Sequence, residues 1–149
     1  MATVLKGRAV VQGKAEGEAL VSRTPFSFFL GVNTDNGVII EEGHEHEGES
    51  ISGKILVYPY GKGSSGDCLR LWRCASNDVA PIAIVNRKAD CVHVQGAIIA
   101  NIPMVCNLDR DPIEMIKTGD HVKVDGGNVT VETEKEQKHN MSTNRGERC

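Results

Sequence analysis

The chain has 149 residues, of which 40% are hydrophobic and 25% charged, and its formal net charge is -3 at pH 7. This length suits one domain with a sizeable core. The mildly acidic balance excludes the basic surface that binds nucleic acid or an anionic membrane. No apolar run approaches the roughly 18 residues of a membrane span, and the N-terminus lacks the pattern of a secretory signal. We therefore expect a cytoplasmic protein.

The five cysteines, at positions 68, 74, 91, 106 and 149, include no Cys-x-x-Cys pair. An odd number at these spacings favours reduced thiols packed as small hydrophobic residues. It argues against a zinc or iron–sulfur site built from this chain alone.

The first part of the chain is predicted to be strands and loops. Residues 8–22 form two short strands broken at Gly13 and Gly17, and an apolar loop follows between Pro25 and Gly31. A turn at residues 35–37 leads into a strand over residues 38–40. Residues 41–50 form a charged surface loop. The apolar run in residues 52–60 is too short for an independent helix and predicts a buried strand.

Helices are predicted in the second part. Apolar residues from Cys68 to Ala75 recur at three- and four-residue steps, which indicates a helix capped by Ser64 or Ser65. A strand at residues 80–86, a short helix at 91–101 and a strand at 102–108 follow. Residues 109–119 carry the signals of a helix with Asp111 as N-cap. Residues 119–132 form a hairpin.

This order of elements predicts one α/β domain over residues 1–132, with a three-layer β/β/α or mixed architecture that is mostly β with two or three short helices. Residues 133–149 are polar almost throughout. They cannot bury enough apolar surface to offset the entropy of ordering, so we expect a mobile tail.

The segment Gly61-Lys62-Gly63-Ser64-Ser65 is the first candidate site. A Walker A loop would need a glycine where Leu56 stands and a hydroxyl where Gly63 stands. A Gly-x-Ser-x-Gly nucleophile elbow is only partly matched. Glycines before a helix N-terminus can nevertheless hold a carboxylate or phosphate, with serine hydroxyls nearby. The alternative is that the glycines only turn the chain and the serines only cap the helix.

Two other segments offer weaker candidates. His44 and His46 alternate with glutamates and could ligate a metal, but a solvated polar loop is the favoured interpretation. Residues 25–29, Pro-Phe-Ser-Phe-Phe, are either an exposed docking surface or core. His93 and His121 are expected to be partly buried structural residues.

The order of several motifs resembles the small subunit of the aconitase X family, a branch of the aconitase superfamily. The motifs are PFSFFLGV, TDNGVII, the histidine at 44 with the glycine at 48, GKILVYPYGKGSS, APIAIVN and GAIIANIPMV. The likeness runs from about residue 7 to 130. Leu30 departs from a usual glycine, and Asp67 with Cys68 replaces a common Gly-Ser that ends the serine signature.

The resemblance implies a swivelling domain that closes over a large catalytic subunit. That partner would hold an iron–sulfur cluster or metal ion, with no cofactor bound by this chain alone. Family members dehydrate small hydroxy acids, and the bacterial ones act on cis-3-hydroxy-L-proline while archaeal ones act on mevalonate 5-phosphate. The modest charge and the cysteines do not suggest a hyperthermophile, which favours the bacterial-type substrate, with mevalonate 5-phosphate as the alternative.

The resemblance also assigns roles, because aconitase-type enzymes take a proton from carbon with a serine on the swivelling domain. Ser64 is the expected catalytic residue. Ser65, Gly63 and Lys62 are expected to contact a carboxylate or oxyanion. Ser27 is a further substrate-binding candidate at the mouth of the site.

Two non-enzymatic alternatives remain. The C-terminal hairpin also resembles the end of phosphohistidine swivelling domains, but His93 lacks the glycine pair expected before a phosphoacceptor. A purely structural scaffold predicts that Ser64→Ala changes nothing but stability.

Overall fold

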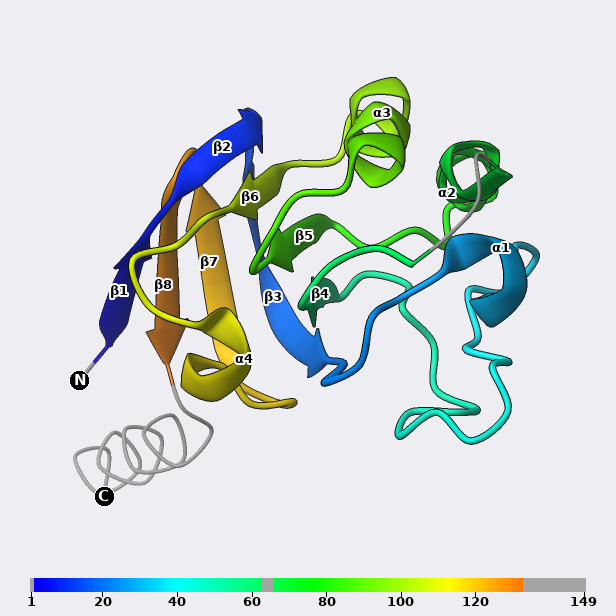
Figure 1. Ribbon diagram of the computed structural model, residues 1–149, viewed down its shortest axis with the longest axis horizontal. Helices are drawn as coiled ribbons and strands as arrows, with labels where there is room; N and C mark the ends of the chain where they lie inside the picture. Colours follow the sequence, from blue (N-terminus) through cyan, green and yellow to red (C-terminus); the bar gives the residue numbers. More distant parts are fainter. Residues whose placement is uncertain (1, 63–65, 133–149) are drawn as a thin grey trace, which may run out of the picture.

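A computed structural model describes residues 2–62 and 66–132 of the chain. Eight strands form one sheet in the order β1-β8-β7-β3-β4-β5-β6-β2 (Figure 1). The strands are β1 (Thr3–Lys6), β2 (Arg8–Val11), β3 (Lys14–Val21), β4 (Ile55–Tyr58), β5 (Ala83–Asn86), β6 (Met104–Cys106), β7 (His121–Asp125) and β8 (Asn128–Glu132). The helices of the described ranges are α1 (Phe28–Gly31), α2 (Gly66–Ser76), α3 (Cys91–Ala100) and α4 (Pro112–Met115). None of these helices has the length and apolar character needed to cross a bilayer.

The sheet is nearly closed, because its two outermost strands are neighbours in the chain. β1 pairs with β8 and β2 pairs with β6, with only Gly7 between β1 and β2. The Gly7 N–H donates to the Gly127 carbonyl at 2.8 Å, which ties this crossing point to the β7–β8 turn. The four strands β3 to β6 are parallel, and the remaining pairs are antiparallel.

β3 joins the parallel and antiparallel parts of the sheet. Residues 14–18 pair with β7, and residues 19–21 pair with β4. The break predicted at Gly17 was wrong, because Gly17 pairs with Val122 inside a continuous strand. A Cβ at Gly17 would lie 2.9 Å from Ile82 Cδ1, so the glycine makes room for packing and does not end the strand.

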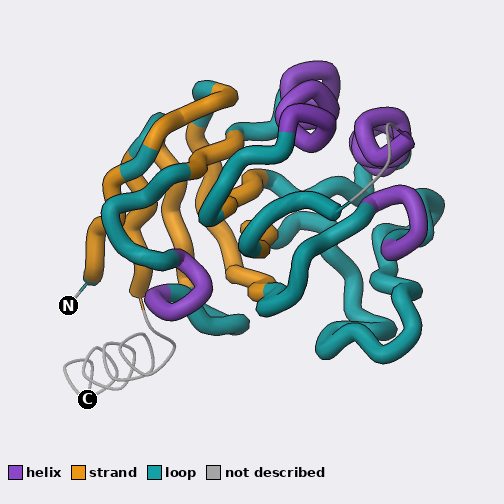
Figure 2. The backbone as a smooth tube through the Cα atoms, in the orientation of Figure 1, coloured by secondary structure: helices purple, strands orange, loops and turns teal. Residues whose placement is uncertain are grey.

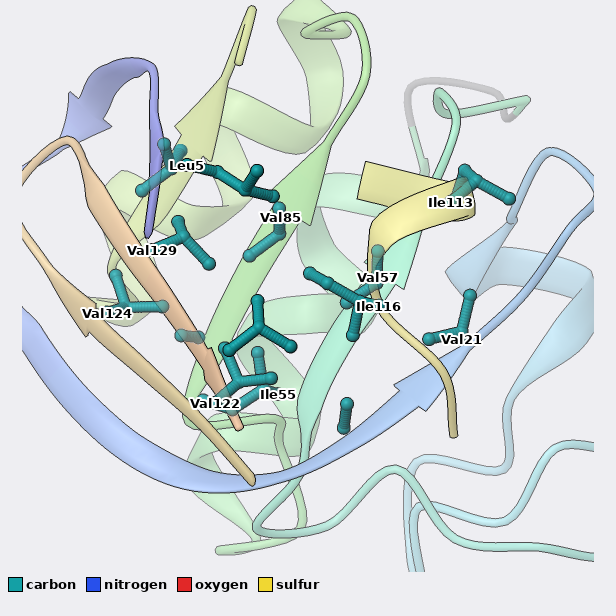
Figure 3. Close-up of a cluster of buried hydrophobic side chains, with 14 residues drawn as sticks. Leu5, Val21, Ile55, Val57, Val85, Ile113, Ile116, Val122, Val124 and Val129 are labelled. Atoms are coloured by element: carbon teal, nitrogen blue, oxygen red, sulfur yellow. The ribbon is translucent and has the colours of Figure 1, made fainter. Parts of the chain in front are cut away.

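Side chains alternate across the central strands and build two cores. Ile55 and Val57 of β4 point into the first, while Leu56 and Tyr58 point into the second. The first core lies inside the curved sheet and is closed at one end by α4 and Ile116 (Figure 3). The second lies beneath α2, α3 and the segment that contains α1. A strand buried on both faces is a continuous apolar run, which explains why β4 was predictable.

The segment between α1 and β4 is almost entirely loop (Figure 2). The strand predicted over residues 38–40 was wrong, since Val38 and Ile39 form only isolated bridges, to Ser50 and Val32. The apolar loop predicted after Pro25 contains the short helix α1, and β1 was not predicted. The expected tail, residues 133–149, lies outside the described residues.

Candidate functional site

The segment before the predicted serine pair is held against the Phe26 segment. β4 ends at Tyr58, and Gly61 forms a parallel bridge with Phe26. The Phe26 N–H donates to the Tyr60 carbonyl at 3.1 Å, and the Lys62 N–H donates to the Phe26 carbonyl at 2.9 Å. The predicted residues Gly63, Ser64 and Ser65 lie outside the described residues. Lys62 and Gly66 are therefore the described ends of this loop, and Gly66 begins α2.

A buried carboxylate lies immediately after the loop. Asp67, in the first turn of α2, has no exposed surface and accepts hydrogen bonds from the Phe28 and Phe29 N–H groups at 3.0 and 2.9 Å. The Ser27 hydroxyl donates to the same carboxylate at 3.2 Å. Burial raises the pKa of Asp67, but the hydrogen bonds from His93, Phe28 and Phe29 outweigh it and hold the pKa below 3.8. Asp67 is therefore ionised at neutral pH.

His93 is the fourth partner of this carboxylate. His93 Nε2 lies 2.6 Å from Asp67 Oδ2, and His93 Nδ1 lies 2.7 Å from the Tyr58 hydroxyl. Burial raises the pKa of Tyr58 far above its usual range, so its hydroxyl keeps its proton and can donate. The consistent arrangement has Tyr58 O–H donating to Nδ1 and Nε2–H donating to Asp67.

The same histidine explains the glycine at position 61. A Cβ at Gly61 would lie 2.7 Å from His93 Cε1, so only glycine lets the chain pass this close to the ring. His93 itself lies on α3, whose N-cap Asp90 accepts hydrogen bonds from the Val92 and His93 N–H groups. Sequence analysis expected a partly buried histidine here, and the ring is in fact fully buried. With both nitrogens engaged, this ring is poorly suited to accept a phosphoryl group.

The structure describes two of the predicted substrate contacts, Lys62 and Ser27. They lie in different environments. Lys62 is half exposed, and its Nζ lies 2.7 Å from Glu41 Oε1. Ser27 is 5% exposed, caps α1 by accepting from the Leu30 N–H at 3.4 Å, and donates its hydroxyl to Asp67. Ser27 is thus part of the buried network, while Lys62 remains accessible.

An open groove begins at the same loop. Phe29, Gly66, Leu69 and Trp72 line a hollow of about 580 Å³ together with two arginines. We call this the α2 groove. Leu69 is 67% exposed and Trp72 is 46% exposed, which is unusual for such large apolar side chains. The segment at residues 25–29 is divided between core and surface, because Phe26 and Phe28 are core while Phe29 is partly exposed and lines this groove.

The segment at residues 41–50, which we call the histidine loop, is mostly exposed, as the sequence predicted, but its two histidines are not solvated. His44 is 8% exposed, lies 2.9 Å through Nε2 from Ser22 Oγ, and accepts the His46 N–H through Nδ1. His46 Nε2 lies 2.7 Å from the Val21 carbonyl. Both rings anchor the loop to the end of β3. Among residues 2–62 and 66–132, no group of three or more His, Cys, Asp or Glu side chains is placed to hold a metal ion.

Comparison with known proteins identifies the fold family. The family model of the aconitase X swivel domain matches residues 4–133. The phosphomevalonate dehydratase small subunit of Methanosarcina mazei is 43% identical over 127 residues, covering 85% of this chain and 88% of that protein. The small subunit of the same name from Thermococcus kodakarensis is 44% identical, covering 86% of this chain and 94% of that protein.

A solved structure agrees with the sequence comparison. The crystal structure of Thermococcus kodakaraensis aconitase X in its holo-form matches with a TM-score of 0.83 and 42% identity, covering 87% of this chain and 98% of that one. The match therefore spans most of this chain and nearly all of the matched chain, and is not limited to a shared substructure. The chain belongs to the aconitase X family and is a swivel domain of that family.

Proposed function

We propose that this chain is the small subunit of a hydro-lyase that dehydrates mevalonate 5-phosphate, and that it acts together with a large subunit. The substrate assignment rests on the names of the proteins to which this chain is similar. Eight of them, at 41–44% identity, are named phosphomevalonate dehydratase small subunit. These names support mevalonate 5-phosphate as the substrate. The sequence alone had favoured the alternative, cis-3-hydroxy-L-proline.

The reaction is the same for either substrate. A β-hydroxy acid loses a proton from its α-carbon and hydroxide from its β-carbon, so that a C–H and a C–O bond break, a carbon–carbon double bond forms and water leaves. A metal centre on the large subunit would assist departure of the hydroxide as a Lewis acid. Ser64 is our candidate for the group that takes the α-proton.

A serine oxygen is a weak base unless its anion is stabilised. α2 begins at Gly66, two residues after this serine in the sequence, and a helix start is a positive dipole end that can stabilise an anion. Lys62 is an accessible cation next to the loop, and its ion pair with Glu41 is half exposed, so exchange for a substrate carboxylate costs little. Gly63 and Ser65 complete the proposed contacts.

The α2 groove is our candidate surface for the large subunit. An enzyme subunit needs its docking surface and its catalytic loop on one side of the domain, and Gly66 both ends the loop and lines the groove. Arg70 stacks over the Phe29 ring at 4.9 Å, and neither Arg70 nor Arg73 forms an ion pair with another described residue. The partner segment that fits is apolar and carries a carboxylate.

The proposal is tested by purifying this chain together with its large subunit and supplying mevalonate 5-phosphate and cis-3-hydroxy-L-proline separately. We expect turnover of mevalonate 5-phosphate that requires both chains, with each chain alone as the control. Turnover of hydroxyproline alone would reverse the substrate assignment. A complex that turns over neither compound would contradict the hydro-lyase, and failure to form a complex would contradict the subunit assignment.

A further inference from the structure

We propose that Asp67 and His93 are positioning residues for the dehydration. They hold the two segments that flank residues 63–65, which we call the serine loop, in the geometry that the reaction needs. Neither residue touches the substrate in this account. The inference rests on the proposed function, since it assigns residues that support the same loop.

The first argument is the set of groups that the Asp67 carboxylate joins. It accepts hydrogen bonds from the start of α1, through the Phe28 and Phe29 N–H groups, and from α3, through His93. Asp67 itself belongs to the first turn of α2. One carboxylate therefore fixes the relative positions of three helices at the point where the loop enters α2.

The second argument is how closely the loop ends lie on members of this network. A Cβ at Gly61 would lie 2.7 Å from the His93 ring, and a Cβ at Gly66 would lie 2.7 Å from Phe29 Cδ2. The chain on each side of residues 63–65 thus lies directly against an aromatic residue of the network, which holds His93 through its ring and Phe29 through its backbone N–H. A shift of either ring would move the corresponding end of the loop.

The third argument is the free-energy cost of burying the Asp67–His93 pair. A fully buried ionised carboxylate must be desolvated, and apolar residues of similar volume often stabilise a fold equally well. The second core already provides apolar contacts around His93, including the Phe28 ring at a centroid distance of 5.0 Å. A buried charge at the edge of the loop is better explained by a need for fixed geometry, because hydrogen bonds are directional and apolar packing is not.

The test compares His93→Leu with His93→Gln in the assembled two-chain enzyme. Leucine fills similar space without a donor, whereas the glutamine amide can still donate toward Asp67 from near the Nε2 position. For His93→Leu we expect kcat to fall on the order of 100-fold with KM changed only a few-fold, as for a misplaced catalytic group. His93→Gln should recover at least a tenth of wild-type kcat, a level about tenfold above His93→Leu.

A matched control separates positioning from general destabilisation. Val124→Ala lowers stability in the first core, on β7, away from the loop, and below its melting temperature it should keep wild-type kcat. Equal kcat in His93→Leu and wild type would overturn the proposal, and so would equal losses in His93→Leu and His93→Gln.

Amide hydrogen exchange on the full-length chain in the complex tests the same claim without turnover. The Phe28 and Phe29 amides should exchange faster in His93→Leu than in His93→Gln, because the Asp67 carboxylate is no longer oriented. Unchanged exchange at both amides would overturn the positioning role. If the wild-type complex fails to turn over mevalonate 5-phosphate, the proposed function fails while this exchange result still decides the positioning claim.

Discussion

His93 Nε2 lies 2.6 Å from Asp67 Oδ2, and neither side chain has any exposed surface. The two residues come from different helices, and Gly96 lets those helices approach, since a Cβ there would lie 3.2 Å from the Cα of Cys68. The pair therefore depends on the packing of α3 against α2, and it forms next to the loop in which the candidate catalytic serine stands.

Removing the carboxylate should destabilise the domain strongly. Asp67→Ala leaves the Phe28 and Phe29 N–H groups and the His93 ring without their buried acceptor, and we expect a loss of about 3–5 kcal/mol in the free energy of unfolding. Urea unfolding of the chain measures it. The control is Asp35→Ala at an exposed position, with an expected change within about 0.5 kcal/mol. A loss under about 1 kcal/mol at Asp67 would show that the network does not hold the fold.

Adding one methyl group at Gly61 should be costly. Gly61→Ala forces a carbon to 2.7 Å from the His93 ring, so we expect about 1–3 kcal/mol of destabilisation. Gly31→Ala is the matched control, because its Cβ would meet only Glu41 Cβ, at 3.9 Å. Thermal unfolding of both variants checks the contrast, and equal melting temperatures would mean that Gly61 is not in steric contact with His93.

The histidine loop should lose stability on mild acidification. Burial lowers the pKa of His44 from 6.5, against the opposing effect of Glu41 and Glu45. Between the folded and unfolded pKa values the unfolded chain binds more protons, so stability is full above 6.5 and falls as pH drops toward the folded value. His44→Asn keeps an acceptor for the His46 N–H but does not titrate. Unfolding free energies at about pH 7.5 and about pH 5 should therefore differ less in His44→Asn than in wild type.

A steeper pH dependence in His44→Asn than in wild type would contradict this assignment.

The α2 groove should be required for assembly with the large subunit. Replacing Leu69 and Trp72 together by serine removes the two most prominent apolar side chains of the groove, and we expect at least a tenfold loss of affinity, or about 1.4 kcal/mol. The matched control is the double serine replacement of Ile98 and Ile99, which are 58% and 56% exposed on α3.

Titration of each variant with the large subunit measures this affinity. The groove assignment is wrong if the α3 variant loses affinity and the α2 variant does not. If this chain alone self-associates in light scattering and the α2 variant does not, the occupant of the α2 groove is a second copy of the chain.

Much of the fold was predictable because its strongest signals are local. The apolar run of β4 and the helical spacing of α2 appear in the sequence and in the structure. α4 begins at Pro112 after the N-cap Asp111, as its signals predict, although it ends at Met115. β1 was missed because only Leu5 of its four residues is buried, which leaves too little alternation to detect.

The candidate site was predictable only in part. The serine pair is a prediction from its motif and lies outside the described residues, whereas Asp67 and His93 are 26 residues apart and meet only through helix packing. Asp67 in the first turn of a helix did not by itself indicate a buried network, since an acidic residue there often only interacts favourably with the helix dipole. The burial of His44 was likewise invisible, because its partner Ser22 lies on the segment after β3.

The most direct test of the central claim is turnover of mevalonate 5-phosphate by the two-chain complex carrying Ser64→Ala, beside wild type and Ser65→Ala. The account predicts that Ser64→Ala assembles normally and loses about 10²–10⁴-fold in kcat, with a smaller loss for Ser65→Ala. Wild-type turnover in an assembled Ser64→Ala complex would contradict the account, because the proton would then be taken by a group outside this loop serine.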